Sequence, residues 1–245
     1  MKKVLVLSTA IVLATTCFAV DGVVLINQAS VMAAGGFPYQ ITQPGSYRLS
    51  SNLLVPSGAS GIIINADNVT LDLNGFSIIG PGVCLGGQFP APCPGFGDTF
   101  IFGVFSGNDN ITVRNGSITG MTDFGISLNG FGNLLEEVHA KFNNIGIAVD
   151  AGVVRRCTAS RNLQAGIEAF LSVVESSASS GNGGSGMIAR DSTVTNNTLN
   201  NNGGPGLDIS FSVYGSNTTR FNSISVLSGT GNTSQKNNNC EGTTC

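Results

Sequence analysis

The chain has 245 residues, of which 41% are hydrophobic and only 10% are charged, and its formal net charge is −3 at neutral pH. This share of apolar residues argues against a disordered chain. The lack of a basic excess argues against nucleic acid or an anionic membrane surface as a partner. Glycine is abundant, with 34 residues, and tryptophan does not occur.

Residues 1–19 have the features of a secretory signal peptide. Two lysines precede an apolar run, Val4 to Ala14, and small residues form a cleavage site that ends at Ala19. The apolar run is too short to cross a bilayer. Cys17 could instead carry a lipid, but the residues before it fit a lipoprotein site poorly. We therefore expect a secreted bacterial protein without a membrane span, with a mature net charge of −5.

Residues 20–36 are expected to form a short N-terminal helix. Apolar residues from Val24 to Ala33 recur near one helical face, Asp21 could cap the start, and Gly35 and Gly36 would end it. A solenoid needs its open apolar end covered, so this helix is expected to cap the fold. The alternative, a helix on a membrane surface, would need basic residues that this segment lacks.

Residues 37–226 contain an internal repeat. A glycine followed by an apolar residue recurs at steps of 21, 20, 20 and 20 residues, at Gly125, Gly146, Gly166, Gly186 and Gly206. A fixed period of this size is typical of a solenoid, whose units bury their apolar faces only by stacking. Within one repeat, Ile147 and Val149 alternate with Ala148 and Asp150, which is the pattern of a strand with one buried face.

Each repeat closes on an asparagine-rich turn, at Asn143, Asn162, Asn182 and Asn202. Asparagine tolerates left-handed backbone conformations, and stacked asparagine amides can pair along an axis. The strands are short and leave no room for a crossover helix, so each coil would add one strand to each of two or three parallel sheets. The leucine pattern of leucine-rich repeats and the longer repeats of β-propellers are missing. The sequence therefore predicts an all-β, right-handed parallel β-helix of about eight coils.

A glycine- and proline-rich insertion, residues 81–99, adds about one period to the repeat region. Insertions of this size in a solenoid can fold over one face and wall a groove. Phe89 and Phe96 lie in it, and their rings could stack on sugars. The alternative is that these rings pack the insertion onto the coils.

Five cysteines would remain after signal-peptide cleavage. In an oxidising compartment the pairs that are near in sequence, Cys84–Cys93 and Cys240–Cys245, are the expected disulfides. Cys157 occupies an inward column of the repeat and is expected to be a small buried residue. Metal binding by cysteine is disfavoured, because CxxC spacing is absent and His139 has no neighbouring ligand in sequence. Residues 227–245, where the period has faded, are expected to form a polar tail closed by the second disulfide.

One outward face gathers the charged residues that could carry chemistry. Counting from the repeated glycines places Asp150, Glu168, Arg190 and Asp208 on the same face of successive coils. Asp150 and Glu168 would lie roughly 8 Å apart, within the ~6.5–9.5 Å separation of the carboxylates of inverting glycosidases. Phe170 is a candidate ligand-binding residue on the same face. The alternative is that these charges only keep a solvated face soluble.

Three runs of the chain point to a known group of proteins: Asp21–Ile26, Ile41–Leu49 and Asn68–Gly80. They resemble the secreted bacterial right-handed parallel β-helix repeat proteins, which share the pectate-lyase-like fold. The resemblance covers essentially the whole mature chain and implies the fold. It does not imply one function, because this fold hosts lyases, hydrolases, epimerases, adhesins and structural proteins.

The well-marked enzymes of this fold carry motifs that the chain lacks. Pectate lyases resemble one another in an acidic calcium cluster and paired arginines, whereas here Arg155–Arg156 is the only adjacent arginine pair and no aspartate cluster accompanies it. The polygalacturonase motifs are also absent. No cofactor is therefore expected, and calcium binding is left open without a supporting motif.

The leading hypothesis is a protein that interacts with extracellular polysaccharide or a cell surface. The first alternative is a divergent polysaccharide lyase or glycoside hydrolase that uses Asp150, Glu168, Asp208 and Arg190. The second is a structural or adhesive surface protein. The sequence does not define the oligomeric state.

Overall fold

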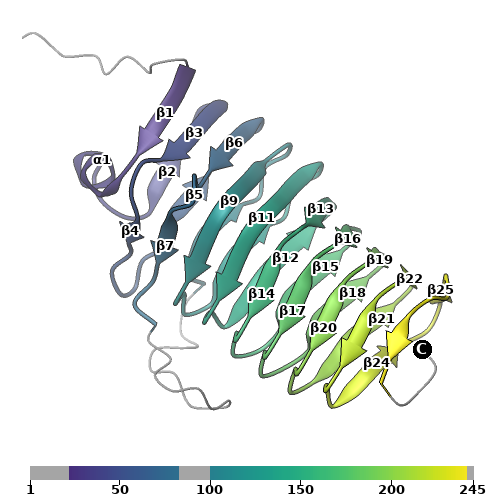
Figure 1. Ribbon diagram of the computed structural model, residues 1–245. Coiled ribbons are helices and arrows are strands. Elements are labelled where there is room, and N and C mark those ends of the chain that lie inside the picture. Colours follow the sequence, from purple (N-terminus) through teal and green to yellow (C-terminus); the bar gives the residue numbers. More distant parts are fainter. Residues whose placement is uncertain (1–21, 83–99, 242–245) are drawn as a thin grey trace, which may run out of the picture.

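The computed structural model describes residues 22–82 and 100–241. The chain forms a parallel β-solenoid of about ten turns, in which the strands of successive turns stack side by side (Figure 1). This confirms the all-β parallel architecture, and the solenoid has more turns than the eight expected. The extra turns lie at the two ends, where the repeat is hardest to recognise in the sequence.

Each turn contributes strands to three faces, which we call faces 1, 2 and 3 in chain order. Face 1 contains β1 (Val23–Ile26), β3 (Gly45–Leu49), β6 (Val69–Asp72), the first halves of β9 (Thr112–Thr119) and β11 (Asn133–Lys141), β13 (Gly152–Arg155), β16 (Val173–Glu175), β19 (Thr193–Thr195), β22 (Val213–Gly215) and β25 (Thr233–Ser234).

Face 2 contains β4 (Leu53–Leu54), β7 (Ser77–Ile79), the second halves of β9 and β11, β14 (Thr158–Ser160), β17 (Ala178–Ser180), β20 (Thr198–Asn200), β23 (Thr218–Arg220) and β26 (Asn239–Cys240). Because β9 and β11 run unbroken through the corner between them, faces 1 and 2 form one sheet, which has 17 strands within residues 22–82 and 100–241.

Face 3 is a separate sheet of nine strands. It contains β2 (Tyr39–Ile41), β5 (Ile62–Ile64), β8 (Phe102–Ser106), β10 (Phe124–Leu128), β12 (Ile145–Asp150), β15 (Ile167–Phe170), β18 (Met187–Arg190), β21 (Pro205–Ser210) and β24 (Ile224–Ser228).

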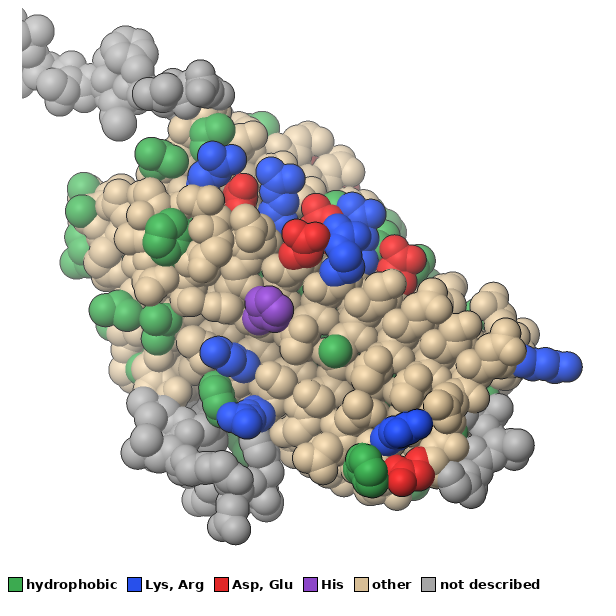
Figure 2. Space-filling view, viewed as in Figure 1, with side chains coloured by type: hydrophobic (Ala, Val, Ile, Leu, Met, Phe, Trp, Pro, Cys, Tyr) green, Lys and Arg blue, Asp and Glu red, His purple; other side chains and the backbone are tan. Residues whose placement is uncertain are grey.

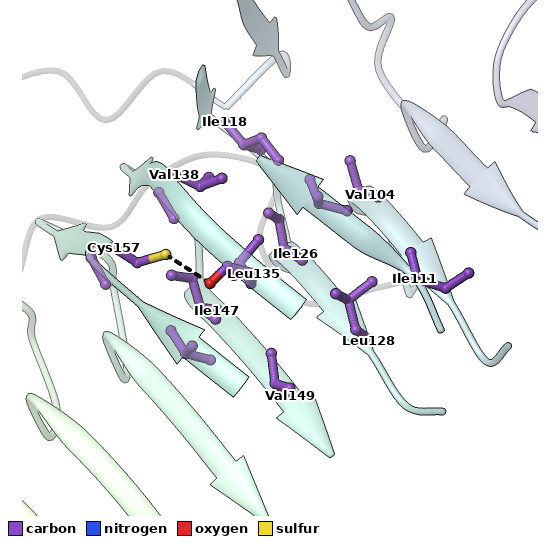
Figure 3. Close-up of a cluster of buried hydrophobic side chains, with 14 of the residues drawn as sticks. Val104, Ile111, Ile118, Ile126, Leu128, Leu135, Val138, Ile147, Val149 and Cys157 are labelled. Carbon is purple, nitrogen blue, oxygen red and sulfur yellow. Dashed lines mark hydrogen bonds between the residues drawn. The ribbon is translucent and has the colours of Figure 1, made fainter. Parts of the chain in front are cut away.

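The core is a column of mostly aliphatic side chains that lies between the three faces, and Figure 3 shows part of it, from Val104 to Cys157. On face 3, the inward position next to each repeated glycine is fully buried and stacks in register, at Ile126, Ile147, Ile167, Met187 and Leu207. Cys157 is buried in the same core, as predicted, and donates a weak hydrogen bond to the Leu135 carbonyl. Burial raises the pKa of the Cys157 thiol to about 12, which disfavours the thiolate at neutral pH.

The turns from residue 142 to residue 238 bend at three corners that are built in the same way. A residue with positive φ turns the chain from one face to the next, and the residue after it points inward and, except for Gly152 and Cys157, is polar. The backbone N–H of each inward residue donates to the side chain below it, which forms one hydrogen-bonded ladder at each corner. The ladder members are Ser172, Ser192, Ser212 and Asn232 at corner 1, Cys157, Ser177, Asn197, Asn217 and Asn238 at corner 2, and Asn143, Asn162, Asn182, Asn202 and Asn222 at corner 3.

The asparagine ladder predicted from the repeat is therefore confirmed at corner 3. Buried amides satisfy both their own hydrogen-bonding groups and the backbone N–H groups that the sheets leave unpaired at the bends.

The N-terminal helix expected over residues 20–36 is present but shorter than expected, because the first part of this segment is a strand. Val23–Ile26 forms strand β1, which pairs in parallel with β3, and the helix α1 is limited to Gln28–Ala33. Asn27 stops the strand, because its side chain accepts from the Ser30 N–H while the Ser30 hydroxyl accepts from the Asn27 N–H. The spacing of the apolar residues in this segment is compatible with a helix or a strand. Hydrogen bonding to β3 stabilises the strand.

Helix α1 lies over the end of face 2. The Gln28 side-chain amide donates to the Leu54 carbonyl (3.3 Å) and accepts from the Leu54 N–H (2.9 Å), so it makes the two bonds that another strand would make with β4. Val31 is fully buried against the core. That the helix protects the open end of the solenoid stays a prediction.

Several further predictions fall outside the described residues. These are the signal peptide, nearly all of the insertion with Phe89 and Phe96, and the cysteines Cys84, Cys93 and Cys245, so both disulfides stay predictions. At the other end, β25 and β26 extend faces 1 and 2 into the segment expected to be an irregular tail. In the part of the chain that the structure describes, no helix is long and apolar enough to cross a bilayer.

Candidate functional site

Face 3 brings the four predicted charged residues onto one outward surface. Glu168 on β15 lies in register between Ala148 on β12 and Ile188 on β18, and Asp208 on β21 follows Ile188 in the same row. Their neighbours along each strand are core residues, so these side chains point outward. The prediction that they share a face is confirmed, whereas their chemical roles stay predictions.

A second row on this face places an aromatic ring between opposite charges. Asp150, Phe170 and Arg190 are direct register partners on β12, β15 and β18. The Phe170 side chain is 44% exposed although it lies in the middle of a strand ladder. Aromatic rings with polar groups on either side are a common arrangement in ligand-binding surfaces, because the ring offers an apolar face and the polar groups fix orientation.

Arg190 and Asp208 are bound to each other. The Arg190 Nη2 lies 2.9 Å from the Asp208 Oδ1, and the Arg190 Nη1 donates to the backbone carbonyls of Asp208 (2.8 Å) and Ala189 (3.0 Å). The guanidinium is therefore held in one orientation by three contacts. Two of the four predicted catalytic residues thus form an ion pair, which suits a positioning role better than proton transfer.

Three carboxyl groups on this side of the molecule hold their protons more tightly than usual. Burial raises the pKa of Glu168, the carboxylates of Asp123 and Asp150 raise it further, and Arg190 opposes the change. Burial also raises the pKa of Asp150. The pKa of Asp123 is raised by burial and partly restored by a hydrogen bond from the Asn144 side chain. Raised carboxyl pKa values are a property of general acids and also of half-buried structural groups.

Asp123 was not found from the sequence. It lies just before β10, two residues ahead of Gly125, whereas only positions after the repeated glycines were considered as candidates. The signal was present, because the same position of the next two repeats holds Asn144 and Gln164, both polar. The candidate site therefore consists of Asp123, Asp150, Glu168 and Phe170, with the Arg190–Asp208 pair beside it.

An aromatic cluster occupies face 3 on the N-terminal side of this site. Phe102 stacks on Phe124 of the neighbouring strand, with ring centroids 5.6 Å apart, and also contacts Phe105 at 4.6 Å and Phe100 at 6.4 Å. The Phe100 side chain is 82% exposed. These rings pack on one another in rows of face 3 that differ from the row of Phe170, which lies at the end of β15.

Within residues 22–82 and 100–241, no three histidine, cysteine or acidic side chains cluster in a way that could hold a metal ion.

The raised pKa of Glu168 predicts a pH-dependent gain in stability when its charge is removed. Between its ordinary and its raised pKa the unfolded chain ionises while the folded chain stays protonated, so stability falls as the pH rises through this interval. Above it, Glu168→Gln is expected to raise the free energy of unfolding by a few tenths to about 1 kcal/mol. Urea unfolding at neutral pH and below pH 4 measures this, because the gain should vanish in acid.

The exposed Asp191→Asn variant is the control for removing a carboxylate from the same part of the solenoid. Equal gains from both substitutions, or a Glu168→Gln gain that persists in acid, would show that burial of Glu168 is not the cause.

The fold is similar to solved phage structures. The Dettilon tailspike protein (gp208) superimposes with a TM-score of 0.56 at 16% identity, over 78% of this chain and 45% of that one. The enzymatically active domain of tailspike protein 2 from bacteriophage CBA120 gives a TM-score of 0.54 at 12% identity, over 82% of this chain and 40% of that one. The chain thus spans less than half the length of either tailspike structure.

The A-module of the mannuronan C-5 epimerase AlgE6 from Azotobacter vinelandii also matches, with a TM-score of 0.48 and 13% identity over 86% of this chain and 72% of that one. No family model and no curated protein matches the sequence. At these identities the likeness shows the fold alone, which is a parallel β-helix of the pectate-lyase-like type.

Proposed function

We propose that this protein is secreted and binds extracellular polysaccharide along face 3. The observation that carries the proposal is the row formed by Asp150, Phe170 and Arg190, in which a partly exposed ring lies between an acceptor and a donor. A sugar ring can place its apolar face on phenylalanine and its hydroxyl groups on the flanking charges. The strand ladder repeats at ~4.8 Å along the axis, which suits an extended polymer.

The charge of the site limits the kind of polymer. Asp123, Asp150 and Glu168 are acidic, and the nearby arginine is already bound to Asp208. An anionic polysaccharide would meet repulsion without a free cation in this cluster, so a neutral polysaccharide is the expected ligand. The signal peptide, the end-capping role of α1 and the two disulfides fit an extracellular protein and belong to the same proposal.

Removal of the Phe170 ring is expected to weaken polysaccharide binding. Affinity electrophoresis through gels that contain neutral or acidic polysaccharides measures this as reduced retardation of Phe170→Ala. We expect a weakening of roughly 5- to 150-fold, because an aromatic stacking contact is worth roughly 1–3 kcal/mol. The control is Phe221→Ala, which removes a ring that is 70% exposed at corner 3, before the start of the face 3 strand β24, whereas Phe170 lies at the end of its strand. Equal retardation of both variants would contradict the assignment of the site.

A second candidate function is cleavage of the bound polysaccharide. The observation that favours it is the raised pKa of three neighbouring carboxyl groups, since a general acid must stay protonated near working pH. Glu168 would donate the proton to the leaving oxygen and Asp150 would act as the base. Release of reducing ends or of unsaturated uronides, with and without calcium, would reveal this activity.

Cleavage that disappears in Glu168→Gln and Asp150→Asn but survives in Asp191→Asn would establish the second function. Binding without cleavage would leave the first. If neither binding nor cleavage is detected with any neutral or acidic polysaccharide, a structural or adhesive role would be favoured.

A further inference from the structure

Face 1 carries a row of charges that alternate in sign, which we call the charge stripe. Six residues on successive turns are direct register partners: Arg48, Asp72, Arg114, Glu136, Arg155 and Glu175. Figure 2 shows a band of alternating blue and red across the upper part of the molecule, with further charged side chains spaced more widely below it. Within the chain, Asp72 lies 3.5 Å from Arg48 and 3.6 Å from Arg114, and Glu136 lies 2.8 Å from Arg155.

A second outward row runs beside the charge stripe and has no charge, and we call it the uncharged stripe. Its members on the first eight turns are Val23, Ser46, Thr70, Thr112, Leu134, Val153, Val173 and Thr193. Val173 is 37% exposed. Small and β-branched side chains of this kind give a surface of even height, onto which a second sheet can pack.

The charge stripe of one copy is electrostatically complementary to the charge stripe of a second copy that runs in the opposite direction. A stripe that reads plus, minus, plus, minus, plus, minus becomes the opposite series when the molecule is turned end over end. The operation is a two-fold rotation about an axis that lies on face 1, along the strands, midway between β9 and β11. It places Arg48 opposite Glu175 of the second copy, Asp72 opposite Arg155, and Arg114 opposite Glu136.

The same rotation keeps each row facing its own kind. Because the axis runs along the strands, the charge stripe meets the charge stripe and the uncharged stripe meets the uncharged stripe, with Ser46 opposite Val173. A two-fold axis along the solenoid would instead place charges against the uncharged stripe, and burying charges without partners is costly. A parallel side-by-side arrangement in register would face like charges. The antiparallel two-fold is therefore the favoured pairing.

We propose that two copies of this chain associate through face 1 as an antiparallel, two-fold dimer. Each charged residue then has residues of opposite sign beside it in its own chain, and it faces a residue of opposite sign in the second copy. These interactions offset the cost of desolvating the charges. Eight turns at ~4.8 Å and a face of about five residues at ~3.3 Å cover roughly 630 Å² on each copy. That is about 1,260 Å² in total, near the lower end of stable interfaces. The closed symmetry limits the assembly to two copies and leaves face 3 open to ligands.

Thiol cross-linking of the Ser46→Cys/Val173→Cys double variant tests the dimer directly. In one chain these positions are five turns, or roughly 24 Å, apart, whereas across the proposed interface they face each other at the ~10 Å separation of packed sheets. A bis-maleimide that spans about 10 Å should convert most of the double variant to a covalent dimer. Neither single variant should be cross-linked, because two copies of one position remain roughly 24 Å apart in the dimer. Cross-linking of the single variants, or none in the double variant, would overturn the proposal.

Sedimentation velocity of the unmodified chain provides the independent measurement. We expect a dimer that weakens as the ionic strength is raised, because the charge stripes contribute to pairing. Val173→Asp should weaken it more than about tenfold, since it places an unpaired charge in the uncharged stripe. The matched control, Thr198→Asp on face 2, should dimerise like the unmodified chain. A monomer at all concentrations, or equal weakening by both variants, would contradict the proposal.

Discussion

Replacing Gly146 by alanine is expected to lower the free energy of unfolding by about 3 kcal/mol or more. A Cβ atom at this position would lie 2.5 Å from the Gly166 carbonyl oxygen and 2.7 Å from the Asn162 side-chain nitrogen. The first is backbone of the next turn and the second belongs to the buried ladder, so neither can move without breaking the stack. Chemical denaturation followed by circular dichroism measures the loss.

The matched control is Gly107→Ala. A Cβ atom at Gly107 would meet nothing within 4 Å, so alanine there should be neutral or stabilising by up to about 0.5 kcal/mol. If the two substitutions cost the same, the repeated glycine is not required by close approach of the turns, and the packing described for face 3 is wrong.

Removing the side chain of Asn182 is expected to be at least as harmful, at about 3–5 kcal/mol. Its Oδ1 accepts from the Asn162 N–H at 2.9 Å, and its Nδ2 donates to the Asn202 Oδ1 and to the Ser179 hydroxyl, each at 2.9 Å. Asn182→Ala leaves these buried groups without partners and opens a cavity. Because the ladder is continuous, the Asn162 amide should also lose its protection against hydrogen exchange.

Thr198→Ala, an exposed substitution on face 2, is the control for this experiment. It should change the free energy of unfolding by less than about 0.5 kcal/mol. An Asn182→Ala variant as stable as this control would mean that water replaces the amide without cost, and the ladders would then not be a main source of stability.

Much of the fold could be predicted from the sequence, because its strictest requirement recurs at a fixed spacing. The repeated glycine marks a position where a Cβ would strike the next turn, as Gly146 shows. The inward asparagine marks the bend at corner 3. The need for glycine at the close approach and for asparagine at the bend recurs about every 20 residues. Both can therefore be recognised from the period of the sequence.

The N-terminal segment could not be predicted, since its structure depends on a partner far away in sequence. Val23–Ile26 is a strand because it pairs in parallel with β3. The helix begins only at Gln28, whose side chain accepts a hydrogen bond from the Leu54 N–H. The apolar residues alone do not distinguish these outcomes. The same holds for β25 and β26, which continue the sheets although the glycine repeat has ended.

Part of the candidate site could also be predicted, because its charged residues lie in turns of regular length. Asp150, Glu168, Arg190 and Asp208 lie in the regular turns, where counting gives the correct face. The ion pair between Arg190 and Asp208 depends on side-chain conformation and is not visible in a pattern. The charge stripe was missed because its members are spaced by 24, 42, 22, 19 and 20 residues. The turns differ in length, and the insertion lies between two of them. Residues that are direct register partners in the sheet are therefore unevenly spaced in the sequence.

The most direct test of polysaccharide binding on face 3 is hydroxyl-radical footprinting of phenylalanine side chains, with and without a polysaccharide that retards the protein. Phe170, Phe221 and Phe131 are 44%, 70% and 69% exposed and report on different parts of the surface in one experiment. Oxidation of Phe170 should fall severalfold on binding while oxidation of Phe221 and Phe131 stays unchanged. Protection of Phe221 or Phe131 with Phe170 still oxidised would place the ligand elsewhere and contradict the proposed function of face 3.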